Sequence, residues 1–154
     1  AELSALGLNV AQRSLGQPIN TDTAIYVADT LGEMGLFYRL CSLVFIGKSM
    51  PQQQGGGGGQ NPIEPALLAC ALIFGPDMSN FSAVSKTLLD AGAAVQVADG
   101  DALKAQVERL LSDGAELNHM MAAAQSVSKL EAGVMDRVMS ALTPYFEGDI
   151  HARA

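Results

Sequence analysis

The chain has 154 residues, of which 49% are hydrophobic and 16% are charged, and its net charge is −7. These values describe one globular domain with a buried core and exclude a disordered chain. The acidic charge excludes a nucleic-acid surface and argues against contact of this segment with an anionic membrane, and no apolar run approaches the roughly 20 residues of a membrane span.

Short apolar runs alternate with helical patterns along the sequence. The predicted strands are Val10–Ser14, Ala24–Ala28, Leu43–Ile46, Ala71–Phe74 and Ala94–Val97. The predicted helices are Gly35–Cys41, Pro62–Cys70, Phe81–Ala91, Asp101–Ser112, Gly114–Leu130 and Gly133–Phe146. Continuous apolar strands separated by helices indicate a parallel sheet covered on both faces. The sequence therefore predicts an α/β fold with a doubly wound, mostly parallel, Rossmann-like sheet.

Several residues have predicted structural roles. Asp101 is expected to cap its helix, and Gly92 is expected to close the helix before it. The cysteines, Cys41 and Cys70, form no CxxC pair and are predicted to be buried reduced thiols. The histidines, His119 and His151, have no partner at ligand spacing, so no metal site is predicted.

Three loops follow predicted strands and can converge on one cleft, because ligands of parallel sheets bind beyond the carboxyl ends of the strands. They are Asp29–Met34, Gly47–Gln60 and Gly75–Asn80. Residues 51–60 are rich in Gln and Gly and are predicted to be mobile.

The glycine-rich loop leads directly into a helix, with Asn61 at the cap, Pro62 just inside and Glu64 in the first turn. Free amides at a helix N-terminus attract anions, and a carboxylate one turn later can accept hydrogen bonds from sugar hydroxyls. This pattern favours a sugar–phosphate site, most simply one for a nucleotide. The alternative interpretation is a surface loop before an ordinary capped helix.

The other two loops also permit two interpretations. Glu33 either contacts a ligand or only stabilises a helix that Asp29 or Thr30 caps. Lys48 offers a positive charge near the cleft or is a solvated loop residue. Gly47-Lys48-Ser49 is not a phosphate-binding P-loop, because Ser42 stands where that motif requires glycine. Phe81 is expected to pack in the core. No set of residues for acid–base or nucleophilic catalysis can be assembled.

Five segments in this order resemble the 3-deoxy-D-manno-octulosonic acid (Kdo) transferases of lipid A assembly. They are VAQRS at Val10–Ser14, DTLGEMGLFY at Asp29–Tyr38, LVFIGKS at Leu43–Ser49, GGQNPIEPA at Gly58–Ala66 and FGPDMSNF at Phe74–Phe81. The resemblance extends from about Leu6 to Phe146. It implies the C-terminal, donor-nucleotide domain of a two-domain GT-B glycosyltransferase.

By this resemblance, the contacts to CMP fall on one group of residues from two loops: Leu31, Gly32, Glu33, Asn61, Pro62, Ile63 and Glu64. A second group has the potential to line the cleft: Ser49, Gly58, Gly59, Gln60 and Asn80. The sequence departs from the family at Lys48, where glycine is usual, and at Gln60 and Asp77, where many members have histidine.

The resemblance also implies the partners. The donor is CMP-Kdo, the acceptor is a lipid A precursor bound by an N-terminal domain, and the reaction takes place at the cytoplasmic face of the bacterial inner membrane without a metal or cofactor. The catalytic base is expected in that other domain, so the isolated chain is expected to be inactive and to belong to a longer protein. In that longer protein, two further strands that this sequence lacks are expected to lie between Val10–Ser14 and Ala24–Ala28. A related GT-B transferase that uses another nucleotide sugar, or a non-catalytic α/β domain, is the alternative.

Overall fold

The computed structural model describes residues 5–51, 57–128 and 143. The chain divides into two compact units, Ala1–Leu36 and Phe37–Ala154, and each is described by itself. The predicted helix at Gly133–Phe146 lies outside the described residues except for Thr143, and most of the Gln/Gly-rich segment lies outside them as well.

The first unit contains two short parallel strands, β1 (Val10–Gln12) and β2 (Ile25–Val27). Val10 pairs directly with Ile25 and Gln12 with Val27. The two strands that we expect between them lie outside this sequence, so their presence in a longer protein stays a prediction. The predicted strand also ends early, since a 3₁₀ turn, η1 (Arg13–Leu15), follows Gln12 at once. Helix α2 (Met34–Leu40) then leads from one unit to the next.

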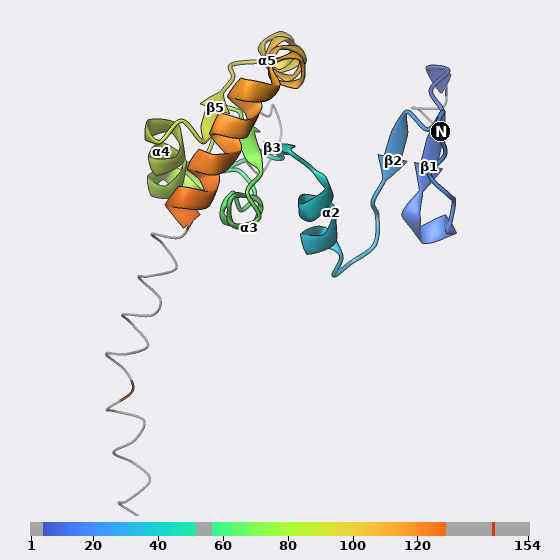
Figure 1. The fold of residues 1–154 in the computed structure, drawn as a ribbon, viewed down its shortest axis with the longest axis horizontal. Helices are drawn as coiled ribbons and strands as arrows, with labels where there is room; N and C mark the ends of the chain where they lie inside the picture. The colour runs from blue at the N-terminus through green and yellow to red at the C-terminus, as the bar shows by residue number, and fades with distance from the viewer. Residues whose placement is uncertain (1–4, 52–56, 129–142, 144–154) are drawn as a thin grey trace, which may run out of the picture. The chain divides into compact units, whose positions relative to one another are not determined.

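A parallel sheet in the order β3-β4-β5 forms the centre of the second unit (Figure 1). Its strands are β3 (Leu43–Ile46), β4 (Ala71–Phe74) and β5 (Ala94–Gln96), close to the predicted ranges. The middle strand, β4, is fully buried. Buried β-branched and aromatic side chains contribute about 1.5–3 kcal/mol each, so β4 holds the unit together.

Successive residues of β4 point to opposite faces of the sheet and fill two separate cores. Leu72 and Phe74 pack with residues from α3 (Ile63–Leu67) and α4 (Ser82–Asp90). Ala71 and Ile73 pack with residues from α5 (Gly100–Ser112). The helix at residues 114–128 contributes to both cores. Helices thus cover both faces of the sheet, as the sequence predicts (Figure 1).

The helix ends confirm one predicted cap and correct another. Gly92 closes α4 with a left-handed backbone, φ +70°, as expected. Asp99, and not Asp101, caps α5, because its extended backbone lets the carboxylate accept a 2.9 Å hydrogen bond from the amide of Ala102. Asp101 lies in the first turn of α5, near the positive end of the helix dipole.

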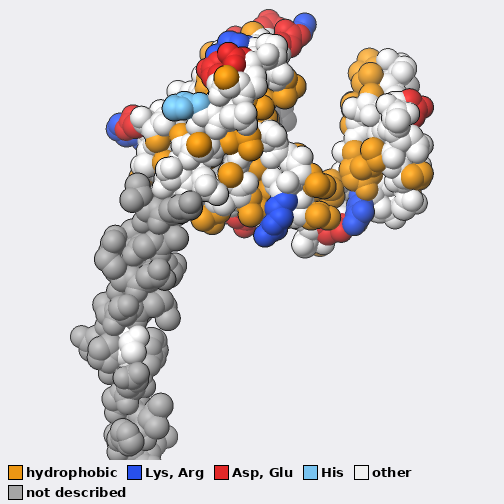
Figure 2. Space-filling model, in the orientation of Figure 1, with side chains coloured by type: hydrophobic (Ala, Val, Ile, Leu, Met, Phe, Trp, Pro, Cys, Tyr) orange, Lys and Arg blue, Asp and Glu red, His pale blue; other side chains and the backbone are white. Residues whose placement is uncertain are grey.

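The exposed surface over α5 carries charged side chains of both signs, which gather at the top of the view in Figure 2. They include Lys104 with Glu108 and Arg109 with Glu116. Such solvated pairs add little stability but keep this face polar. In the described part of the chain, no helix combines the length and the apolar character that crossing a membrane requires.

The two cysteines differ in their surroundings. Cys70 is buried as predicted, and its Sγ lies 3.1 Å from the carbonyl oxygen of Tyr38 and 3.3 Å from that of Cys41. Burial raises the pKa of the Cys70 thiol. Cys41 is exposed, so the prediction for it is wrong: it follows the last turn of α2, where the side chain has no core residues over it.

Ala69, just after α3, has a left-handed backbone with φ +59°. We predict that Ala69→Gly raises the free energy of unfolding by about 0.5–1 kcal/mol, because glycine adopts this conformation without a steric penalty. Chemical denaturation measures the change. Ala91→Gly, at an exposed alanine with φ −82°, is the matched control and is expected to destabilise the protein. Equal effects of the two substitutions would contradict the assignment of strain to Ala69.

Candidate functional site

The turns after β3 and β4 are joined through a buried hydroxyl. Ser49 is fully buried, and its Oγ donates to the carbonyl oxygen of Ile46 at 2.5 Å and accepts from the amide of Gly75 at 2.7 Å. The carbonyl oxygen of Ser49 accepts from the amide of Asp77 at 2.9 Å. A Cβ at Gly75 would stand 2.2 Å from that oxygen, so only glycine fits here. Ser49 therefore holds the two turns together and does not line a cleft.

The glycine-rich loop packs against both turns through its backbone. Asp77 Oδ2 accepts from the amide of Gly58 at 2.8 Å, and the carbonyl of Gly58 accepts from the amide of Asn80 at 3.1 Å. The amides of Gly59 and Gln60 donate to the carbonyls of Lys48 and Gly47. The amides of three consecutive residues, Gly58, Gly59 and Gln60, thus donate to the protein itself.

Backbone conformation and close packing require glycine in this loop, and hydrogen bonds place Asp77 beside it. Gly58 and Gly59 have φ of +92° and +73°, and a Cβ at either position would meet Asn80 or Met78 at 2.4 Å. Asp77 also accepts two hydrogen bonds from Ser79, and these bonds together lower the pKa of the Asp77 carboxyl. The ionised carboxylate therefore fastens the loop to the turn after β4.

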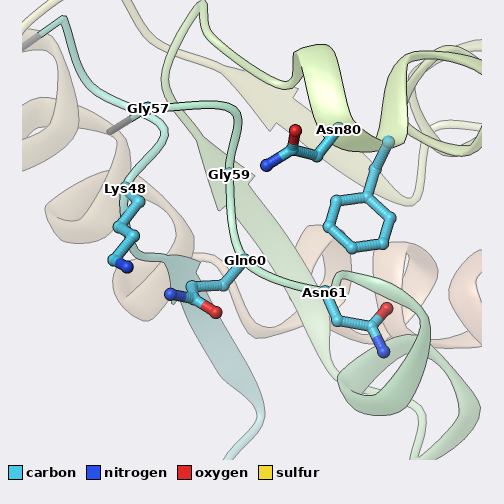
Figure 3. A pocket seen from close by; sticks show the side chains of 7 residues that line it. Lys48, Gly57, Gly59, Gln60, Asn61 and Asn80 are labelled. Carbon is cyan, nitrogen blue, oxygen red and sulfur yellow. The ribbon is translucent and has the colours of Figure 1, made fainter. Parts of the chain in front are cut away.

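A cavity of about 430 Å³ opens between these turns (Figure 3). Its lining combines polar and apolar surface and comprises Lys48, Gly57, Gly59, Gln60, Asn61, Asn80 and Phe81. In the view of Figure 3, the side chains of Lys48 and Gln60 extend toward each other, and the amide of Asn80 extends toward Gly59. Two of the three predicted loops thus meet at one cavity. Phe81 packs partly into the core, as expected, while its ring also closes one side.

The helix after the glycine-rich loop begins at Ile63, one residue later than predicted, and has five residues. Asn61 Oδ1 accepts from the amide of Ile63 at 2.9 Å, so Asn61 opens the helix although Pro62 holds the formal cap position. Pro62 is buried, whereas Glu64 is exposed in the first turn. Of these four residues, Asn61 lines the cavity and Glu64 is free to meet a ligand from solvent.

In the first unit, the loop after β2 is bound to the end of β1. Arg13 Nη2 lies 2.5 Å from Glu33 Oε1, its Nε lies 3.1 Å from Oε2, and Thr30 Oγ1 also donates to Glu33. The Arg13 guanidinium and this hydroxyl lower the pKa of Glu33 to about 2. Leu31, next to Thr30, is fully exposed, and Gly32 has φ +81°.

The carboxylate of Asp29 is also held by hydrogen bonds from residues at the end of β1. Its carboxylate accepts from Gln12 Nε2 at 2.6 Å and from the Oγ and amide of Ser14 at 2.6 and 3.0 Å, and these bonds lower its pKa to about 2. Sequence analysis did not pair Arg13 with Glu33. The available signal was that both follow parallel strands, whose ends meet at one edge when the strands are neighbours. Convergence of Leu31, Gly32 and Glu33 with the cavity of the second unit stays a prediction.

Comparisons with known proteins agree on one family. A 3-deoxy-D-manno-octulosonic acid transferase from Rickettsia bellii is 34% identical over 131 residues, which cover 84% of this chain and 30% of that protein. The enzyme of this name from Bordetella pertussis is 32% identical over 144 residues, 92% of this chain and 32% of its own length. The chain therefore spans about 30% of the length of these relatives. No protein-family model matches it.

A solved structure gives the same result for the fold. The C-terminal CMP-Kdo binding domain of WaaA from Acinetobacter baumannii matches with a TM-score of 0.74 and 30% identity, covering 80% of this chain and 63% of that domain's chain. This likeness, with the parallel strands and flanking helices, confirms the predicted α/β class and the C-terminal half of a GT-B enzyme.

We predict that Ser49→Ala lowers the free energy of unfolding by about 1–3 kcal/mol, because the buried amide of Gly75 and carbonyl of Ile46 lose their partner. Denaturant unfolding monitored by circular dichroism measures the loss. Thr87→Ala is the matched control, since its exposed hydroxyl also donates to a backbone carbonyl and its removal is expected to change stability by less than about 0.5 kcal/mol. A loss as small for Ser49 as for Thr87 would refute the bridging role.

We predict that acid loosens the loop of the first unit. Asp29 and Glu33 have folded pKa values of about 2, below their ordinary values of 3.8 and 4.5. The unfolded state therefore takes up protons first, so these carboxylates stabilise the fold above about pH 4.5 and lose that effect as the pH falls toward about 2. Amide chemical shifts of Val10–Gln12 measured by NMR should change over this interval. Glu33→Gln should remove the part of this chemical-shift change that comes from protonation of Glu33. Chemical shifts that stay constant down to pH 2 in the wild type would contradict the prediction.

Proposed function

Because the chain belongs to the 3-deoxy-D-manno-octulosonic acid transferase family, we propose that it is the donor-nucleotide half of an inverting glycosyltransferase that uses CMP-Kdo. The observation that carries this proposal is the match to the solved CMP-Kdo binding domain over 80% of the chain. The transferase reaction and its partners belong to a longer protein of the relatives' length, and they are proposed here for that protein.

The second unit offers suitable chemistry for a nucleotide. The cavity is lined by side-chain amides from Gln60, Asn61 and Asn80 and by the ammonium of Lys48, which donate hydrogen bonds to phosphate and base oxygens. Glu64 lies in the first turn of α3, beyond Asn61, where its carboxylate can accept from ribose hydroxyls. We assign the CMP contacts here to Asn61, Ile63 and Glu64, and not to Pro62, which is fully buried.

The loop of the first unit supplies the remaining proposed contacts, Leu31, Gly32 and Glu33. Arg13 and Thr30 hold Glu33 in one ionised orientation, so its carboxylate is fixed before a ligand arrives. The exposed Leu31 and the left-handed Gly32 place backbone groups at the surface of the same turn.

In the proposed reaction, the acceptor hydroxyl attacks the anomeric carbon of Kdo while the bond to the CMP phosphate breaks. Negative charge then builds on the departing phosphate, and donors fixed around it lower the barrier. This chain supplies those donors and holds CMP. We propose that the attacking group belongs to a lipid A precursor at the cytoplasmic face of the bacterial inner membrane, and that another domain binds it and provides the base.

We predict that CMP raises the melting temperature of the protein, because a ligand that binds only the native state stabilises it by about 2.7 kcal/mol at 100 times its Kd. Glu64→Gln should weaken CMP about tenfold by removing a charge-assisted acceptor. Calorimetric titration measures both affinities.

Glu108→Gln on the solvated face of α5 is the control and should leave CMP affinity unchanged. Titration with UDP separates this family from transferases of other nucleotide sugars. UDP that binds as tightly as CMP, or an unchanged affinity in Glu64→Gln, would count against the proposed assignment.

A further inference from the structure

Lys48 has a backbone conformation that its side chain disfavours. Its φ is +58°, and only Ala69 shares such a value among the non-glycine residues that the structure describes. Contacts of the neighbouring backbone hold Lys48 in this conformation. The carbonyls of Gly47 and Lys48 accept hydrogen bonds from the amides of Gln60 and Gly59, and the next residue, Ser49, is buried. A residue held in the left-handed region costs about 1–3 kcal/mol, and such strain concentrates at functional sites. Glycine would fit here at no cost.

The side chain of Lys48 is also the one charged group in the cavity lining. Lys86 and Lys104 pair with Asp90 and Glu108 one turn away, but no ion pair of Lys48 occurs within residues 5–51, 57–128 and 143. The nearby Asp77 carboxylate already accepts three hydrogen bonds from Gly58 and Ser79. The ammonium thus faces the cavity without a carboxylate that neutralises it.

The other donors around the cavity supply no positive charge. The amides of Gly58, Gly59 and Gln60 are engaged within the protein, and the neutral amides of Gln60 and Asn80 supply no charge. The chain as a whole carries a net charge of −7, which repels a nucleotide. A phosphate in this cavity therefore depends on Lys48 for a compensating charge.

We propose that Lys48 determines the specificity of this site for a phosphorylated ligand, by binding the phosphate of the donor nucleotide through its ammonium. The proposal rests on the proposed function, since it assigns the phosphate end of the same nucleotide. It implies that the chain keeps a strained lysine, where glycine would be more stable, in return for phosphate affinity.

Lys48→Gly tests this proposal, because the substitution should weaken CMP binding and at the same time stabilise the protein without ligand. It should weaken CMP about tenfold, since a charge-assisted hydrogen bond is lost, and should leave the affinity for cytidine, which has no phosphate, unchanged. Without ligand, it should raise the melting temperature by a few degrees, because the strain is relieved. The difference in CMP affinity should shrink as salt is raised, since salt screens an exposed charge. Lys48→Met, which keeps the aliphatic stem, should weaken CMP equally.

Two control variants separate charge from backbone. Ala69→Gly removes the same kind of strain at the end of α3 and should leave CMP affinity unchanged. Lys104→Ala removes one positive charge from α5 and should do the same. Lys48→Arg keeps the charge and should bind CMP within about threefold of the wild type.

The outcomes distinguish this inference from the function on which it rests. If the wild-type protein binds neither CMP nor cytidine, the proposed function falls and the role of Lys48 falls with it. If the wild type binds CMP and Lys48→Gly and Lys48→Met bind it equally well, the inference alone is overturned. Equal losses of CMP and cytidine affinity in both variants would also overturn it, because they would show a role in cavity shape.

Discussion

The candidate site depends on one buried hydroxyl. Ser49 Oγ satisfies two backbone groups at the carboxyl end of the sheet, the carbonyl of Ile46 and the amide of Gly75. Because a buried backbone group without a partner is costly, these turns have little freedom to separate. Gly75 approaches the Ser49 backbone so closely that no side chain fits, and the turn from β4 lies directly on the turn from β3. The position of every cavity residue follows from this contact.

A second layer of contacts converts the joined turns into a cavity. Asp77 reaches from the β4 turn to Gly58, and the carbonyls of Gly47 and Lys48 take up the next two amides of the glycine-rich loop. Gly58, Gly59 and Gln60 are thus each bound through the backbone to one of the two turns. Glycine serves here for close packing against Met78 and Asn80. The groups of this loop that are left to meet a ligand are therefore mainly the side chains of Gln60 and Asn61.

Periodicity and hydrophobicity sufficed to predict the fold of the second unit. Leu43–Ile46 and Ala71–Phe74 were predicted to the residue, because an apolar run between polar turns has few other stable arrangements. The cap at Asp99 was missed because Asp99 and Asp101 both lie at the start of the same helix, and only backbone geometry distinguishes the cap from the first turn. Similarly, Ser49 was assigned to the cleft because burial of a single hydroxyl leaves no pattern in a sequence.

The contrast between the two thiols has a practical consequence. Cys70 is enclosed and its sulfur lies against two carbonyl oxygens, whereas Cys41 faces solvent. An alkylating dye or spin label therefore attaches at one position in the unmodified protein, because only an accessible thiolate reacts readily. The chain thus carries its own attachment point for spectroscopy, near the start of β3, without engineered cysteines.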